Sequence, residues 1–129
     1  MTSTYLSKLE QYHHEHLTWE RILEFFRQEN AFLKTRLSEV LDLTTDNTFL
    51  SLAEQFQNQF ITNDEFMDEL KQDIHTMEVQ LKKDIINQSP VPDKKLEARH
   101  NRLRNEMEYL EKNFTQLRNE FNKYLVSLL

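Results

Sequence analysis

Apolar side chains recur every three or four residues along the first third of the chain. They form one uninterrupted row, with histidine and asparagine at two places: Tyr5, Leu9, Tyr12, His16, Trp19, Leu23, Phe26, Asn30, Leu33, Leu37 and Val40. This heptad pattern is typical of an α-helix that packs along others, and it places Leu9, His16 and Asn30 at a positions. Ile22 and Phe25 widen the row, which favours a helix with two neighbours.

The same spacing continues in two further segments. The middle row consists of Phe49, Ala53, Phe56, Phe60, Asn63, Met67, Leu70, Ile74, Met77 and Leu81. The last row consists of Leu96, His100, Leu103, Met107, Leu110, Phe114, Leu117, Phe121, Tyr124 and Leu128. Thr62-x-x-Glu65 is typical of a capping box that starts a helix. Because the middle row passes through 61–64 in phase, we predict one continuous helix there.

Two short segments without this spacing separate the rows. "DLTTDN" offers Thr44, Thr45 and Asp46, residue types that cap helix N-termini. "NQSPVP" contains the only two prolines of the chain, and proline ends a helix. Asp93 follows as the next N-cap.

We therefore predict an all-α fold: a single domain, 1–129, built as an elongated antiparallel up-down-up three-helix bundle with coiled-coil-like heptad packing. The helices should span 4–42, 46–87 and 93–128, roughly 55–60 Å each at 1.5 Å per residue. Short connections force neighbouring helices to run antiparallel. The alternative is an open helical hairpin that completes its core by dimerising, since a long, thin bundle has a large surface for its volume.

Composition narrows the chemistry. The chain contains no glycine, which excludes the phosphate-binding P-loop, the dinucleotide-binding turn and the nucleophile elbow. It also contains no cysteine, which excludes thiol catalysis and fits a reducing compartment. No set of nucleophile, base and orienting group is identifiable. We therefore expect a protein without enzymatic activity or cofactor. Because neither a signal peptide nor an apolar run of about 18 residues is found, we also expect a cytoplasmic protein without membrane contact.

Charge is distributed unevenly along the chain. The formal net charge of −6 argues against nucleic-acid binding. Residues 1–43 contribute −2, residues 44–92 contribute −6 and residues 93–129 contribute +2. The acidic middle helix and the basic last helix should therefore attract each other inside the bundle. An alternative use of the positive charge is an anionic partner, which would bind the basic run Lys94, Lys95, Arg99, Arg102 and Arg104.

Asn30 and Asn63 occupy positions in the apolar rows. Antiparallel pairing about the first connection matches residues whose numbers sum to about 90, so Asn30 should face Phe60. A hydrogen bond from Asn30 to Asn63 or Gln59 would fix the register of the two helices at a cost in stability.

Histidine is the main candidate for site chemistry, because three of the five histidines lie in "HHEH" at residues 13–16. Pairing about the second connection, with sums near 180, brings all five histidines into the same third of the bundle. Imidazole is a common metal ligand, so the candidate ligands are His13, His16, Glu20, His75 and His100. Glu10-x-x-His13 and Glu97-x-x-His100 resemble helical metal motifs, but both glutamates should face solvent, and we commit to no metal site.

Two other interpretations of the histidines remain open. A buried His16 or His100 would act as a pH switch if protonation destabilised the core, unless Glu20 or Glu78 balanced the charge. In the structural interpretation, His16 and His100 fill the apolar rows and bond to each other or to Tyr12. His13, His14 and His75 would then lie on the surface, and Glu15 would point outward or lie at the flank.

Nearly all of the aromatic residues belong to the rows and are predicted to form the core. Phe25, Phe66 and Tyr109 lie at the edges of the rows, where they could face a second copy of the chain. We therefore predict an interaction or scaffold protein that self-associates, as a homodimer or larger homo-oligomer. A small metal-binding bundle with a His/Glu site is the alternative, and a binder of an anionic partner is a further one.

The segment "AEQFQNQFITNDEFMDEL", residues 53–70, resembles a stretch found in short, uncharacterised bacterial helical-bundle proteins. The resemblance covers mainly the middle helix. It implies a helical fold and a bacterial source, and it implies no particular function.

Overall fold

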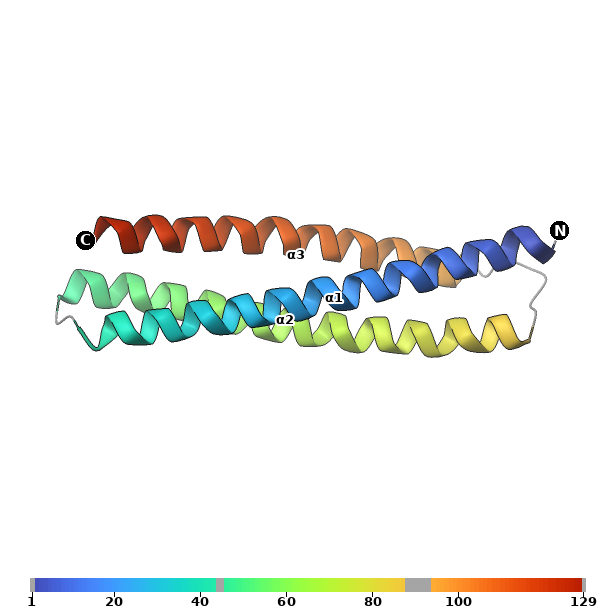
Figure 1. Ribbon diagram of the computed structural model, residues 1–129, viewed down its shortest axis with the longest axis horizontal. Helices are drawn as coiled ribbons and strands as arrows, with labels where there is room; N and C mark the ends of the chain where they lie inside the picture. The colour runs from blue at the N-terminus through green and yellow to red at the C-terminus, as the bar shows by residue number, and fades with distance from the viewer. Residues whose placement is uncertain (1, 44–45, 88–93, 129) are drawn as a thin grey trace.

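Three long α-helices make up the protein. A computed structural model describes residues 2–43, 46–87 and 94–128, with side chains from residue 8 onward. The helices are α1 (Thr2–Leu41), α2 (Asn47–Ile86) and α3 (Lys94–Ser127). They lie side by side in an elongated bundle, in which α2 runs opposite to α1 and α3 (Figure 1). The predicted all-α three-helix bundle is therefore confirmed.

The helix ends agree with the predicted ends to within one or two residues. Asp46 is the N-cap of α2, and its side chain accepts a hydrogen bond of 2.9 Å from the backbone N–H of Thr48. The other predicted caps, Thr44, Thr45 and Asp93, lie outside the described residues, as do the two prolines. None of the described helices has an apolar stretch long enough to cross a bilayer.

α2 continues without a break through residues 61–64, as its apolar row predicted. Thr62 does not act as an N-cap there. Its hydroxyl donates a hydrogen bond of 2.9 Å to the backbone carbonyl of Asn58, four residues earlier. Threonine makes this bond inside a helix, so the capping-box motif is satisfied without starting a new helix.

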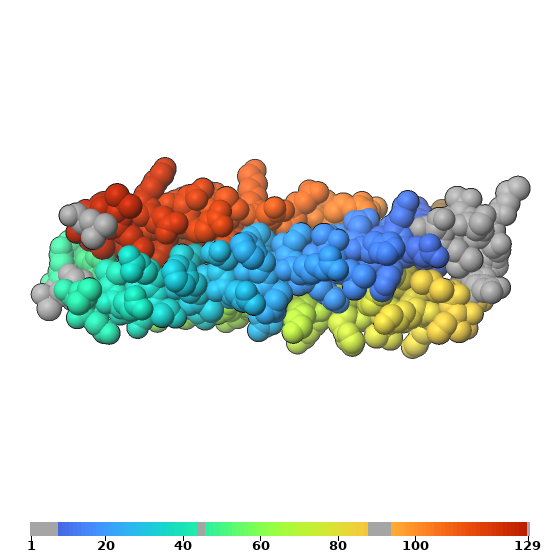
Figure 2. Space-filling model, in the orientation of Figure 1, coloured from blue at the N-terminus to red at the C-terminus, as the bar shows by residue number. Residues whose placement is uncertain are grey.

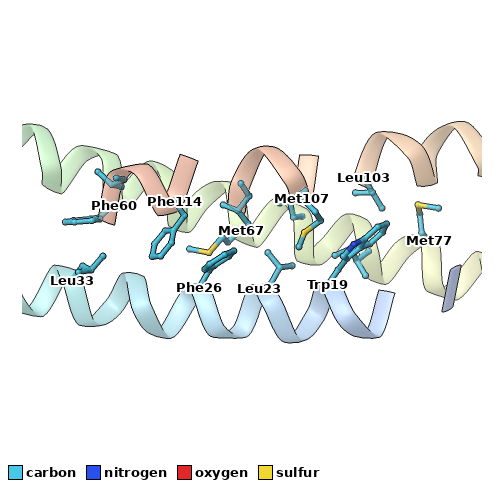
Figure 3. Close-up of a cluster of buried hydrophobic side chains, with 14 of the residues drawn as sticks. Trp19, Leu23, Phe26, Leu33, Phe60, Met67, Met77, Leu103, Met107 and Phe114 are labelled. Carbon is cyan, nitrogen blue, oxygen red and sulfur yellow. The ribbon is translucent and has the colours of Figure 1, made fainter. Parts of the chain in front are cut away.

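The core is formed by the three predicted rows. Side chains from all three helices point toward a common axis, where Phe26 of α1 meets Phe114 of α3 with 4.9 Å between ring centroids (Figure 3). The described row residues of α1 are buried up to Leu37. The rows are less complete at the end of the bundle where α3 finishes, because Leu128 is 44% exposed there.

The two flanks of α1 face different helices. Residues at e positions of its heptads pair with α2: His13 with Glu78, Arg27 with Asp68 and Lys34 with Asp64. Residues at g positions pair with α3: Lys8 with Glu97 and Glu15 with Arg104. These ion pairs join α1 to its neighbours, whereas the charge distribution predicted pairing between the acidic middle helix and the basic last one.

Asn30 fixes the register between α1 and α2. Its side-chain NH₂ donates to the backbone carbonyl of Phe60 at 2.9 Å, so the predicted pairing of these two residues is confirmed. The same NH₂ donates to Asp64 Oδ1 at 2.7 Å, and Lys34 binds the other carboxylate oxygen. The predicted partners Asn63 and Gln59 were wrong, because Asp64 at an e position lies on the flank of α2 that faces α1.

Candidate functional site

Two buried histidines interrupt the apolar core in the third of the bundle where α1 and α3 begin. His16 of α1 and His100 of α3 have no exposed surface, and their ring centroids are 5.2 Å apart. The ring of Tyr12 stacks on His100 at 3.7 Å, and the indole of Trp19 lies 4.9 Å from the same imidazole. We call Tyr12, His16, Trp19 and His100 the histidine layer.

Glu78 of α2 binds two histidines of α1 at once. One carboxylate oxygen contacts Nδ1 of His13, and the other lies 2.5 Å from Nδ1 of His16. The Glu78 side chain is only 12% exposed. Because an ionised carboxylate can only accept hydrogen bonds, both Nδ1 atoms must carry their protons.

Glu15 of α1 links the histidine layer to α3. Its two carboxylate oxygens accept hydrogen bonds from the guanidinium of Arg104, at 3.1 Å from Nε and 2.7 Å from a terminal nitrogen. Bidentate pairs of this kind are among the stronger charge-assisted hydrogen bonds. Nε2 of His100 lies 3.3 Å from the same carboxylate. Of the two positions expected for Glu15, outward or at the flank, the structure shows the flank, because its g position faces α3.

Three ring nitrogens of the buried histidines have no hydrogen-bond partner. They are Nε2 of His16 and both nitrogens of His100, since the 3.3 Å approach to Glu15 does not have hydrogen-bond geometry. A buried polar atom without a partner destabilises the folded state by about 1–3 kcal/mol. The histidine layer therefore lowers the free energy of unfolding relative to a fully apolar core.

Electrostatics keep His100 neutral. Burial lowers the pKa of His100 from 6.5 to about 4, because a charged imidazolium is poorly solvated in the core. The Glu15 carboxylate opposes this shift, while His16 and Arg104 add to it. Burial alone would raise the pKa of Glu15, but the hydrogen bonds from Arg104 lower it, and so does the closeness of His100, so the pKa is lowered overall.

The candidate metal ligands do not meet at one point. His13 and His16 come together on Glu78, but Glu20 and His75 line a surface groove between α1 and α2. Within the described part of the chain, no three His, Asp or Glu side chains are arranged to hold a metal ion.

Sequence reasoning missed Glu15 as a carboxylate of this site, and it named Glu78 only as one of two alternative counter-charges, beside Glu20. The pairing sums did contain the signal. A sum near 90 places Glu78 opposite residues 12–13, and the two sums together place Glu15 beside residue 105, next to Arg104. The assignment of Glu15 to an outward or flanking position hid this relation, because the flank in question faces α3.

The basic run at the start of α3 does not form one surface. Arg104 is bound to Glu15, and Arg102 pairs with Glu106 at 3.3 Å on its own helix. Arg99 and Arg102 line a shallow groove beside α2 that also contains Asp73. Lys94 and Lys95 are exposed. Carboxylates therefore accompany the arginines that were candidates for an anionic partner.

The three aromatic residues predicted to face a second copy lie on two different sides of the bundle. Phe66 of α2 and Tyr109 of α3 pack edge to face, with ring centroids 6.1 Å apart, beside a groove between their helices. Phe25 lies instead in a groove between α1 and α3 and is 52% exposed. The sequence did not single out Phe32, which is 64% exposed.

Comparisons of the chain with protein-family models, with curated proteins and with solved structures find no match. The resemblance of residues 53–70 to bacterial helical-bundle proteins stays a prediction.

Proposed function

We propose that this protein is a non-enzymatic helical interaction protein, and that its partner is a second copy of itself, bound along the boundary between α1 and α3. The observation that carries the proposal is the exposure of Phe25 and Phe32, at 52% and 64%. These residues are seven positions apart, so they project from the same face of α1.

The boundary between α1 and α3 runs along the length of the face shown in Figure 2. Phe25 lies there in a first depression, together with Ile22, Phe26 and Thr115. A second depression at the far end of the same boundary is lined by apolar side chains of the three helices and of the residues that follow α1 and α3: Val40, Leu43, Phe49, Leu125, Val126 and Leu128. Leu43 is 85% exposed and Val126 is 68% exposed. Exposed apolar surface along one helix boundary suits a helical partner.

The charges along this boundary favour a second copy over a partner of one strong charge. Arg21 and Arg118 line the first depression together with Glu111. Arg36 and Glu39 line the second. A symmetric dimer brings the same surface of both copies together, so a surface with both signs of charge can complement itself.

The non-enzymatic part of the proposal is supported by the state of the histidines. His16 and His100 have no exposed surface, so their ring nitrogens cannot reach a substrate in this conformation. A cytoplasmic location is part of the same proposal, because a chain without cysteine needs no oxidising compartment.

Solution mass across a wide range of protein concentration tests the proposal. We expect the wild type to dimerise and Phe25→Ser/Phe32→Ser to weaken dimerisation at least tenfold, because the apolar contact is lost. Tyr109→Ser is the matched control: Tyr109 is 64% exposed, like Phe32, but lies beside α2. A wild type that stays monomeric, or a control that weakens dimerisation as much as the double variant, would overturn the proposal.

A further inference from the structure

Ring contacts of the histidine layer, and hydrogen bonds beside it, join the start of α3 to α1. Tyr12 and Trp19 of α1 contact the ring of His100. Glu15 holds Arg104 by two hydrogen bonds in the same third of the bundle. Farther along, the boundary between these two helices opens into the depressions that contain Phe25 and Leu43.

Every element packed around the two buried rings supplies ionisable groups. α1 contributes Tyr12, His13 and Glu15. α2 contributes Glu78, and α3 contributes Arg104. Each carboxylate is already engaged: Glu78 accepts from both His13 and His16, and Glu15 accepts twice from Arg104.

Protonation of these histidines would create buried N–H groups without acceptors. Nδ1 of His16 already donates to Glu78, so a second proton goes to Nε2, which has no partner. At His100, Nε2 lies 3.3 Å from the Glu15 carboxylate, but Nδ1 has no partner. Two imidazolium rings with centroids 5.2 Å apart would also repel each other.

We propose that the histidine layer is an acid-sensitive latch, which holds the start of α3 against α1 only while His16 and His100 are neutral. Acidification protonates the two rings, and they leave the core for water. The Tyr12 and Trp19 contacts to His100 then break, while the pairing of α1 with α2 through Asn30 and Lys34 remains. This inference does not depend on self-association.

The direction of the effect follows from burial. The pKa of His100 is lowered from 6.5 to about 4, so opening takes up a proton and is favoured as the pH falls through this range. Glu15 stays ionised over most of the same range because its pKa is lowered as well. The Glu15 carboxylate attracts a protonated His100 and so reduces the lowering of its pKa, but burial has the larger influence.

Trp19 makes the test direct, because it is the only tryptophan of the chain and touches the latch. Near-ultraviolet circular dichroism and tryptophan fluorescence would be followed from pH 7.5 to pH 3.5 in the full chain. We expect the packed Trp19 signal of the wild type to be lost between about pH 6.5 and 4. His16→Phe/His100→Phe keeps flat rings in the core, and its transition should move at least one pH unit lower.

The matched control is His14→Phe/His75→Phe, which makes the same chemical change at two exposed sites. Its transition should coincide with that of the wild type. A wild-type transition unchanged in His16→Phe/His100→Phe would overturn the latch, since carboxylates alone would then account for it.

A second measurement covers the case in which the core variant fails to fold. Imidazole proton resonances of the wild type should show His100 protonating below the ordinary histidine pKa of about 6.5, together with the change at Trp19. Amide hydrogen exchange should show residues 94–110 losing protection before α2. Protonation of His100 near pH 6.5 without any change at Trp19 would overturn the proposal. Loss of amide protection in all three helices in one step would also overturn it.

Discussion

At the scale of single residues, position on the helix decides what each charged side chain does. Glu15 and His14 are neighbours in "HHEH", yet Glu15 holds Arg104 and His14 is exposed. Successive helical residues point in directions about 100° apart, so adjacent residues rarely share a site. The contiguous motif is therefore not the functional unit, and the histidine layer is assembled from two helices with carboxylates from α1 and α2.

Glu78 should be the most sensitive carboxylate of the protein. Glu78→Ala leaves the buried Nδ1–H of His16 without an acceptor, so we expect a loss of about 1–3 kcal/mol in the free energy of unfolding. Glu78→Gln keeps one acceptor oxygen and should lose less. Urea unfolding at pH 7.5 measures both changes.

Glu69→Ala is the control for this comparison, because Glu69 is an exposed carboxylate of the same helix. Its effect should stay within about 0.5 kcal/mol. Equal losses for Glu69→Ala and Glu78→Ala would show that the contacts of Glu78 contribute nothing.

At the scale of elements, buried polar residues set how the helices align. Asn30 is fully buried, and its side-chain NH₂ donates to Phe60 and Asp64 across the α1–α2 contact. The side-chain amide oxygen, Oδ1, has no hydrogen-bond partner. An apolar residue would pack there without that deficit. Polar residues at a positions are known to fix register and oligomeric state at a cost in stability, and Asn30 fits that role.

Asn30→Leu should therefore raise the free energy of unfolding by about 1 kcal/mol, because a buried polar group without full partners is replaced by an apolar one. It should also make the helix register and the oligomeric state less well defined. We expect a higher urea midpoint together with more than one oligomeric species in solution mass measurements. Asn63→Leu, at a half-buried row position of α2, is the comparison. A less stable Asn30→Leu protein with an unchanged oligomeric state would contradict the register role.

At the scale of the whole molecule, the two ends of the α1–α3 boundary differ. One third is fastened by the histidine layer and by the Lys8–Glu97 and Glu15–Arg104 pairs. The other end exposes Leu43 and Val126. This asymmetry separates the two proposed properties, since the latch and the self-association surface lie in different parts of the bundle.

Stability of the whole protein should fall as the pH is lowered. His100 has a lower pKa folded than unfolded, so its contribution is fully present above about pH 6.5 and is lost as the pH falls toward 4. The full loss from His100 is about 3 kcal/mol, from 1.36 kcal/mol per pKa unit between 6.5 and about 4. Glu15 adds a further loss below its ordinary pKa of 4.5, because its folded pKa is lowered.

Urea unfolding at pH 7.5, 6 and 5 measures this dependence. The midpoint should fall at each step in the wild type and fall less in His100→Phe. A midpoint that rises on acidification would reverse the assigned sign.

The heptad rows predicted the helices and most of the core, because periodic burial leaves a direct trace in the sequence. The pairing sums also placed His16 and His100 in the same third of the bundle. They left Glu20 and Glu78 as alternative counter-charges for the buried histidines, because both lie near the same level of the bundle, and the structure places Glu78 on His16. Glu20, the carboxylate among the candidate metal ligands, lies in the surface groove with His75.

The sequence by itself determined three helices, their ends, the residues they bury and the antiparallel order imposed by short connections. Only the tertiary structure decided which flank of α1 faces which neighbour. Three helices can close around the same apolar rows in two arrangements of opposite hand, which exchange the e and g flanks. In the arrangement adopted here, His13 meets Glu78 and Glu15 meets Arg104. Since both arrangements bury the same rows, the apolar pattern carries no information that distinguishes them.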